Sequence, residues 1–299
     1  MQLPESIDIT EVCPRDGFQN HKPLINAETK KEIIDDLCKL GFTRMEITSF
    51  VSPKAIPQMS DAGEVVRFFN SRWAEQIEGI SLIPNLKGAE LALKAGAKSL
   101  IMVVSASEKH NMENTGRTVA DSLAELAEIS RIKGGADLNI GIGTSFFCPF
   151  AGEIAVSDVM EIIRASLDLG ISNITIADTS GTANPLKVHD SLSSIKKEFS
   201  CSGFSLHFHD TYGFGLANVL TAMQLGYTSF ESSAAGMGGC PFAPGATGNL
   251  ATEDLVNMAA GMGIKTGINL PDLLEVSRRI TKRLNLSLAS HSASTQLGL

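Results

Sequence analysis

The stretch FSLHFHD (204–210) is a short apolar run that ends in two histidines and an acid. Runs of the same kind recur at IDITEV (7–12), TRMEIT (43–48), IEGISLI (77–83), SLIMVV (99–104), LNIGIG (138–143), NITIAD (173–178) and TSFESS (228–233). The segments between them, such as 30–40, 121–130 and 159–169, repeat apolar residues at spacings of three and four, which is typical of amphipathic helices. Strands that are apolar throughout are buried on both faces, so the pattern predicts a parallel sheet covered by helices.

The number of strand–helix units sets the architecture. Eight units spread over most of the 299 residues predict an α/β fold of the closed (β/α)₈ TIM-barrel type, with an additional C-terminal helix near 271–284. A doubly wound open sheet is the alternative, but no G-x-G-x-x-G motif follows the first strand. We expect a single catalytic barrel domain over residues 1–299, in which residues 285–299 form a polar tail.

Composition limits the classes of partner. The net charge is −8 and no basic stripe occurs, so neither nucleic acid nor an anionic membrane surface is an expected partner. The five cysteines are scattered along the chain, which is typical of a reducing compartment. The first residues lack the pattern of a signal peptide, and no stretch approaches the ~18 apolar residues of a membrane span. We therefore expect a cytoplasmic protein.

Unusual polar residues follow the strands, where a barrel of this kind collects its chemistry. Each has an ordinary structural explanation: Asp178 could cap a turn, Asn249 could begin a helix, and Glu46 could pair with Arg15. Their position at the same end of one barrel makes a common site the better explanation. The candidate residues are Arg15, Asp16, Glu46, Asp178, His207, His209, Cys240 and Asn249.

The two histidines indicate a metal centre. His207 and His209 point to the same side of their strand, roughly 7 Å apart along the backbone. Asp16 and Asn249 could add oxygen ligands from the first and eighth units, which adjoin the seventh in a closed barrel. Two nitrogens and two oxygens, with room for a substrate oxygen, suit Mg²⁺ or Mn²⁺ better than zinc. Cys240 lies in the glycine-rich loop 236–249, which predicts either a working thiol on a gating loop or, less favoured, a phosphate cradle.

Several motifs together resemble the 3-hydroxy-3-methylglutaryl-CoA lyase family, whose members are metal-dependent barrel enzymes. The resemblance rests on EVCPRDGFQN (11–20), MEITSFVSPK (45–54), IPNLKG (83–88), LHFHDTYG (206–213) and AAGMGGCPFAPGATGNLATEDLV (234–256). It implies a divalent metal held by Asp16, His207, His209 and Asn249, and a catalytic centre of Arg15, Glu46, Asp178, His207 and Cys240. It also implies an acyl-CoA substrate, a homodimer, and substrate contacts from Arg15, Gln19, Asn85 and Lys87.

The implied reaction is a retro-Claisen cleavage of 3-hydroxy-3-methylglutaryl-CoA to acetoacetate and acetyl-CoA. The sequence departs from the family pattern at His21, His110, Gly116 and Ala151, where the acyl group and the pantetheine arm are expected to pass. A lyase for citramalyl-CoA or for a longer 3-hydroxyacyl-CoA therefore stays open. So do a condensing enzyme of the isopropylmalate synthase type, a Schiff-base aldolase using Lys54 or Lys87, and a barrel that binds acyl-CoA without turnover.

Overall fold

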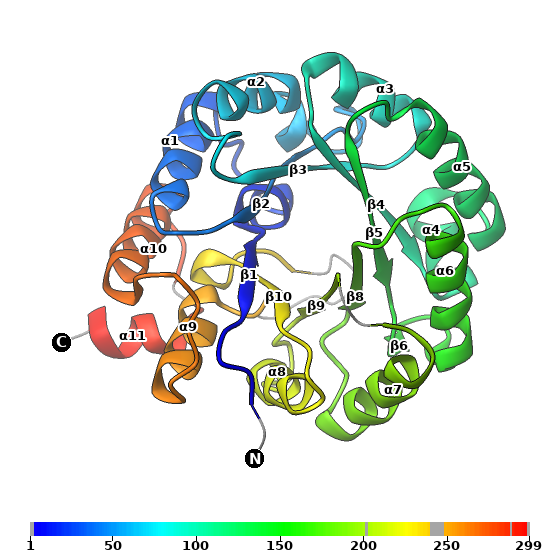
Figure 1. Ribbon diagram of the computed structural model, residues 1–299. Helices are drawn as coiled ribbons and strands as arrows, with labels where there is room; N and C mark the ends of the chain where they lie inside the picture. The colour runs from blue at the N-terminus through cyan, green and yellow to red at the C-terminus, as the bar shows by residue number, and fades with distance from the viewer. Residues whose placement is uncertain (1–2, 201–202, 240–247, 288, 298–299) are drawn as a thin grey trace.

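A computed structural model describes residues 3–200, 203–239, 248–287 and 289–297. Eight parallel strands close into a barrel, in the order β1-β10-β9-β8-β5-β4-β3-β2, with helices around the outside (Figure 1). The strands are β1 (Asp8–Glu11), β2 (Arg44–Ser49), β3 (Glu78–Ile83), β4 (Ser99–Ser105), β5 (Asp137–Gly143), β8 (Ile174–Asp178), β9 (Phe204–Phe208) and β10 (Ser229–Ser232). This confirms the predicted fold class and all eight predicted strands.

Helices alternate with these strands and cover the barrel. They are α1 (Ala27–Cys38), α2 (Ala62–Arg72), α3 (Leu86–Ala95), α4 (Glu108–Thr115), α5 (Val119–Ile132), α6 (Val156–Asp168), α7 (Pro185–Glu198), α8 (Gly215–Gln224), α9 (Thr252–Gly261), α10 (Leu270–Leu284) and α11 (His291–Leu297). Helix α10 confirms the predicted C-terminal helix. Within the described ranges, no helix is both long and apolar enough to cross a membrane.

Short elements that were not predicted modify the barrel mouth. A π-helical turn, η1 (Cys13–Gly17), follows β1, and 3₁₀ turns η2 (Pro57–Met59) and η3 (Ala234–Gly236) follow β2 and β10. A two-stranded hairpin, β6 (Phe147–Cys148) with β7 (Gly152–Glu153), follows β5. These elements arise in loops, where local turn geometry rather than hydrophobic periodicity decides the conformation.

Within the predicted polar tail, residues 285–299, helix α11 is packed against α9. Asp254 at the start of α9 explains the packing. Its carboxylate accepts hydrogen bonds from Ser290 Oγ (3.0 Å) and from the backbone N–H groups of His291 (2.9 Å) and Ser292 (2.6 Å). Ala293 is fully buried beside them. The segment is therefore tied to the barrel by one carboxylate.

Strand alternation divides the core into two layers. On β5, Gly141 and Gly143 line the barrel interior, so the alternate residues Ile140 and Ile142 face outward, where both are fully buried under the helices. The apolar core therefore lies mainly between the sheet and the helices. The barrel interior holds polar residues, a smaller set of apolar side chains and a cavity.

Candidate active site

A cavity of about 470 Å³ opens at the carboxyl ends of the strands. This is the end at which barrel enzymes carry their chemistry. Charged and imidazole side chains line one part of it, from η1 after β1 and from β2, β9 and β10. They are Arg15, Asp16, Glu46, His207, His209 and Glu231.

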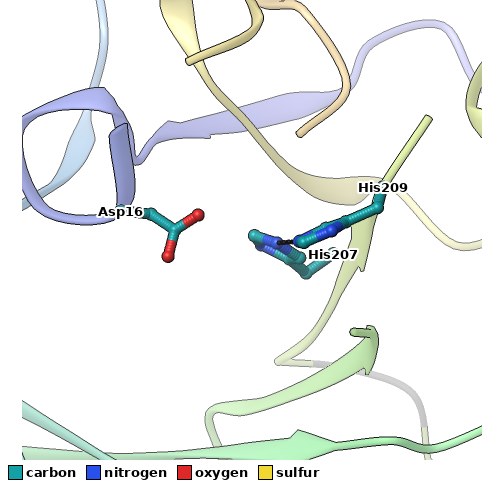
Figure 2. Close-up of side chains that lie close together, drawn as sticks. All are labelled: Asp16, His207 and His209. Atoms are coloured by element: carbon teal, nitrogen blue, oxygen red, sulfur yellow. Dashed lines mark hydrogen bonds between the residues drawn. The ribbon is translucent and has the colours of Figure 1, made fainter. Parts of the chain in front are cut away.

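Asp16, His207 and His209 form a group that could hold a metal ion. One ligand atom from each lies within 4.8 Å of the others. Figure 2 shows the Asp16 carboxylate, on η1, facing the two imidazoles at the end of β9. The Nε2 atoms of His207 and His209 lie 3.1 Å apart and face one another. The structure thus brings together three of the four predicted ligands.

Asn249, the fourth predicted ligand, adjoins this group. Its backbone pairs with that of His209 in an antiparallel bridge. Its Nδ2 donates to Asp16 Oδ2 (2.6 Å) and to the Met237 carbonyl (2.9 Å), which leaves its buried Oδ1 without a hydrogen-bond partner. A buried carbonyl oxygen without a donor is costly unless something else satisfies it. Asn249 was predicted as ligand or as N-cap, and the structure shows that α9 begins later, at Thr252.

The close approach of Asn249 to Asp16 requires glycine next to it. A Cβ on Gly238 would lie 2.5 Å from Asn249 Nδ2 and 2.7 Å from Asp16 Oδ2. Its φ of +105° also lies in the left-handed region. Any side chain at position 238 would therefore push the two candidate ligands apart.

Arg15 is held between two carboxylates. Its Nε donates to Glu46 Oε2 at 2.5 Å, its Nη2 pairs with the same carboxylate, and its Nη1 donates to Asp16 Oδ1 at 2.5 Å. Burial alone would lower the pKa of Arg15, but Glu46 and then Asp16 outweigh it and raise that pKa, so the guanidinium stays charged. Glu46, only 1% exposed, fixes the direction in which Arg15 faces the cavity.

Glu231, on β10, is a site residue that the sequence did not single out. Its Oε2 lies 2.9 Å from His207 Nδ1, and its Oε1 accepts a hydrogen bond from Thr175 Oγ1 at 2.7 Å. When His207 Nδ1 carries the proton that it shares with Glu231, the lone pair of Nε2 faces the cavity. A carboxylate behind a metal-binding histidine is the usual arrangement for fixing the tautomer and orientation of the ring.

The electrostatics of the group favour the protonation states in which Asp16 and His209 can bind a metal ion. Burial would raise the pKa of Asp16, but Arg15 and then the two histidines hold it below its usual value, so the carboxylate is ionised. Burial, helped by the neighbouring His207, lowers the pKa of His209 to about 3, so this imidazole is neutral. An ionised carboxylate and a neutral imidazole are the forms that bind metal ions.

Three predicted residues do not line the cavity: Asn249, which adjoins it through Asp16, and Asp178 and Lys87. Asp178 ends β8, but the residues of β8 and its loop that line the cavity are Thr175, Ala177 and Thr179, so alternation turns Asp178 toward the helices. Its Oδ2 instead accepts a hydrogen bond from the Ala183 backbone at 3.0 Å. The prediction that Asp178 lies in the catalytic centre is therefore not supported by its position.

Lys87 is likewise misplaced as a substrate contact. Its side chain is 73% exposed in the first turn of α3 and pairs with Glu90 at 2.9 Å. The other predicted substrate contacts, Arg15, Gln19 and Asn85, do line the cavity. Asn85 also caps α3, because its Oδ1 accepts from Gly88 N at 2.8 Å. His110, one of the departures from the family pattern, lines the cavity too, with Nδ1 2.6 Å from Ser105 Oγ.

Cys240, the predicted thiol, lies outside the described residues. Cys13, Cys38 and Cys148 are buried free thiols, and burial raises the pKa of Cys13 and of Cys38, the latter to about 12. These two thiols are therefore protonated and suited to packing rather than to chemistry.

The fold and this site define a class: a (β/α)₈ barrel with a candidate metal centre at its carboxyl-terminal mouth. Comparison with known proteins gives the family. The HMGL-like family model matches residues 6–280, and the chain belongs to that family. It is 40% identical to the mitochondrial hydroxymethylglutaryl-CoA lyase of Homo sapiens, over 97% of this chain and 90% of the human protein. It is 38% identical to a hydroxymethylglutaryl-CoA lyase of Bacillus subtilis, over 98% of both chains.

Solved structures agree with this assignment. The chain is similar to an HMG-CoA lyase of Acinetobacter baumannii in complex with coenzyme A and 3-methylmalate, with a TM-score of 0.93, 42% identity, and coverage of 98% of this chain and 95% of that one. It is also similar to the Bacillus subtilis HMG-CoA lyase, with a TM-score of 0.95, 37% identity, and coverage of 99% and 100%.

Proposed function

We propose that this chain is a carbon–carbon lyase that cleaves 3-hydroxy-3-methylglutaryl-CoA to acetoacetate and acetyl-CoA. The observation that carries the proposal is 38–40% identity to hydroxymethylglutaryl-CoA lyases over nearly the full length of the chain. The cavity supports it independently, because a buried cation, three carboxylates and two imidazoles meet at the mouth of the barrel.

Mg²⁺ or Mn²⁺ is the proposed cofactor, held by Asp16, His207, His209 and Asn249. The donor set fits, because Asn249 Oδ1 is buried with no hydrogen-bond partner among the described residues, and the two imidazole Nε2 atoms lie close together beside Asp16. Among the residues that the structure describes, no thiolate lies in the group, which disfavours a closed zinc site. A divalent ion held there supplies Lewis acidity, which lowers the pKa of a hydroxyl next to it.

The reaction requires a proton to leave the 3-hydroxyl and the C2–C3 bond to break. The electron pair of that bond moves to C2, so the ketone of acetoacetate forms at C3 and the enolate of acetyl-CoA departs. Arg15 is proposed to stabilise the enolate oxygen, since it is a buried, charged donor that lines the cavity. Glu46 keeps the guanidinium in place, and Glu231 keeps His207 Nε2 directed to the cavity.

A proton must finally reach C2 of the enolate. We propose Cys240 as the donor, because the resemblance implies a thiol on the loop after β10. Exchange of Cys240 for alanine is expected to lower turnover while Mn²⁺ still binds. Exchange of His207 for alanine is expected to abolish both turnover and Mn²⁺ binding. Equal Mn²⁺ affinity in the wild type and in the His207 variant would contradict the ligand assignment.

A Schiff-base aldolase has no support from the two lysines considered for it. Lys54 and Lys87 are both exposed, and neither lines the cavity. Borohydride should therefore trap no adduct at either residue.

The decisive test of the proposal is a direct assay. Purified protein with Mg²⁺ or Mn²⁺ is expected to release acetyl-CoA and acetoacetate from 3-hydroxy-3-methylglutaryl-CoA. Release of free CoA from acetyl-CoA and a 2-oxo acid, with no cleavage, would instead identify a condensing enzyme. The homodimer implied by the resemblance is tested by light scattering on the same preparation.

A further inference from the structure

Two glycines on one strand enlarge the barrel interior. Gly141 and Gly143 are two apart on β5, and both line the cavity. Neither has a positive φ, so the backbone does not require glycine at either position. Glycine weakens a strand interior and often marks a place where a ligand comes close to the backbone. The absence of side chains at these two positions therefore widens the cavity in front of β5.

The surroundings of the two glycines show how that space is bounded. A Cβ on Gly143 would meet Ser105 Oγ at 3.4 Å, Thr179 Oγ1 at 3.5 Å and Val103 Cγ1 at 3.7 Å, which are ordinary contacts. A Cβ on Gly141 would lie 3.2 Å from Val103 Cγ2, so Val103 would have to move slightly. A methyl group can thus be added at either position with little strain, at the expense of cavity volume.

The strand residues on this side of the cavity are mainly apolar, and the hydroxyl groups of Ser105 and Thr179 adjoin Gly143. We call Leu82, Ile101, Val103, Gly141 and Gly143 the apolar wall; all five line the cavity, from β3, β4 and β5. The candidate metal group and Glu231 come from the β1, β9 and β10 side, whereas His110 and Arg117 line the cavity from the segment after β4. In the barrel order, two strands separate β9 from β4 and two separate β10 from β3, so these two strand pairs lie across the barrel from one another (Figure 1).

A cavity with charged groups at one place and apolar side chains at another can orient a substrate that has both polar groups and an apolar substituent. The proposed substrate carries its carboxylate, hydroxyl and thioester oxygens as polar groups, and one apolar substituent on C3. When the polar groups meet the charged side, the C3 substituent is left to face the apolar wall. A methyl group alone would leave unfilled the space that two absent side chains provide.

We propose that the apolar wall binds the C3 substituent, and that the chain cleaves 3-hydroxy-3-alkylglutaryl thioesters whose alkyl group is longer than methyl. The inference rests on the proposed lyase function and names its substrate class. Gly141 and Gly143 act in it as specificity-determining residues, because they set how far an alkyl chain can extend toward β5.

The test compares two substrates on one preparation. Acetyl-CoA release is measured with Mn²⁺ from the CoA thioesters of 3-hydroxy-3-methylglutarate and 3-butyl-3-hydroxyglutarate, for the wild type and for Gly141→Ala and Gly143→Ala. The quantity compared is the ratio of kcat/KM for butyl over methyl, which does not depend on the folded fraction of a variant. Gly135→Ala is the matched control, because Gly135 is exposed, just before β5, with nothing within 4 Å of its Cβ.

We expect a wild-type ratio of at least about one tenth, and a fall of about tenfold in both cavity variants, as is typical for one methylene group in an apolar pocket. The control should keep the wild-type ratio. A smaller wild-type ratio, or one that neither cavity variant changes, would overturn the inference while methyl cleavage upheld the proposed function. Cleavage of neither substrate would overturn both.

Discussion

Replacement of Glu231 tests whether the carboxylate behind His207 supports metal binding. Two variants separate its charge from its shape. In Glu231→Gln, the amide oxygen can still accept from His207 Nδ1, and the amide nitrogen can donate to Thr175 Oγ1. In Glu231→Ala both contacts, at 2.9 Å and 2.7 Å, are lost, and two buried donors are left without acceptors.

The magnitudes follow from these contacts. Loss of a hydrogen-bonded group behind a metal-binding histidine typically lowers metal affinity by about 10- to 100-fold. We expect about tenfold for Glu231→Gln, which keeps the ring orientation but loses the negative charge, and about 100-fold for Glu231→Ala, which loses both. On the free-energy scale these are about 1.4 and 2.7 kcal/mol.

Titration calorimetry with Mn²⁺ alone measures the affinities without any need for turnover. Glu78→Gln is the matched control, because Glu78 is also a strand glutamate with an ion-pair partner, Arg44 at 2.7 Å, but it begins β3 at the opposite end of the barrel. It should bind Mn²⁺ like the wild type. Wild-type affinity in Glu231→Ala, with the fold intact by circular dichroism, would refute the reasoning.

Three further predictions concern the residues around the site. Arg15→Lys should lower kcat by about 10²- to 10³-fold, since a lysine cannot make the same paired contacts, and an unchanged kcat would remove the proposed role. Burial raises the pKa of Glu11 from 4.5 to about 8, so this carboxyl favours the folded state below pH 4.5 and loses that contribution as the pH rises to about 8. In urea titrations, Glu11→Gln should therefore gain stability relative to the wild type by at most about 1.4 kcal/mol per pH unit across that range; a difference independent of pH would contradict this. Gly248→Ala should destroy Mn²⁺ binding, because its Cβ would lie 1.8 Å from the Gly238 carbonyl oxygen. Gly213 also has a left-handed φ, but a Cβ there would meet open space, so Gly213→Ala should cost only about 1–2 kcal/mol of stability.

The fold followed from the sequence because its strands are continuous apolar runs. Such runs mark burial on both faces, and eight of them separated by amphipathic helices leave few architectures. The same feature hides the direction of each side chain. In NITIAD (173–178) apolar residues occupy both faces, so nothing in the sequence says that Ala177 faces the cavity and Asp178 the helices. The misplacement of Asp178 comes from this.

The candidate site residues that lie in sequence motifs could be predicted, and those whose position depends on how the strands pack together could not. His207 and His209 are linked by spacing alone, and Asp16 and Asn249 follow strands that close the barrel. Glu231 had one available signal, a lone acid within TSFESS (228–233), but an acid near the end of a strand is equally common on a solvated edge. Only the barrel register, which sets Glu231 beside His207, distinguishes the two cases.

The hydrogen bond between Asp16 and Asn249 joins positions 233 residues apart in the chain. It lies where β1 meets β10, the pair of strands that completes the ring. An ion bound by both residues would hold β1 and β10 together, and its removal would weaken this strand pair before any other part of the barrel. Hydrogen exchange at β1 and β10 should therefore quicken first when a chelator is added, while β4 and β5 stay protected.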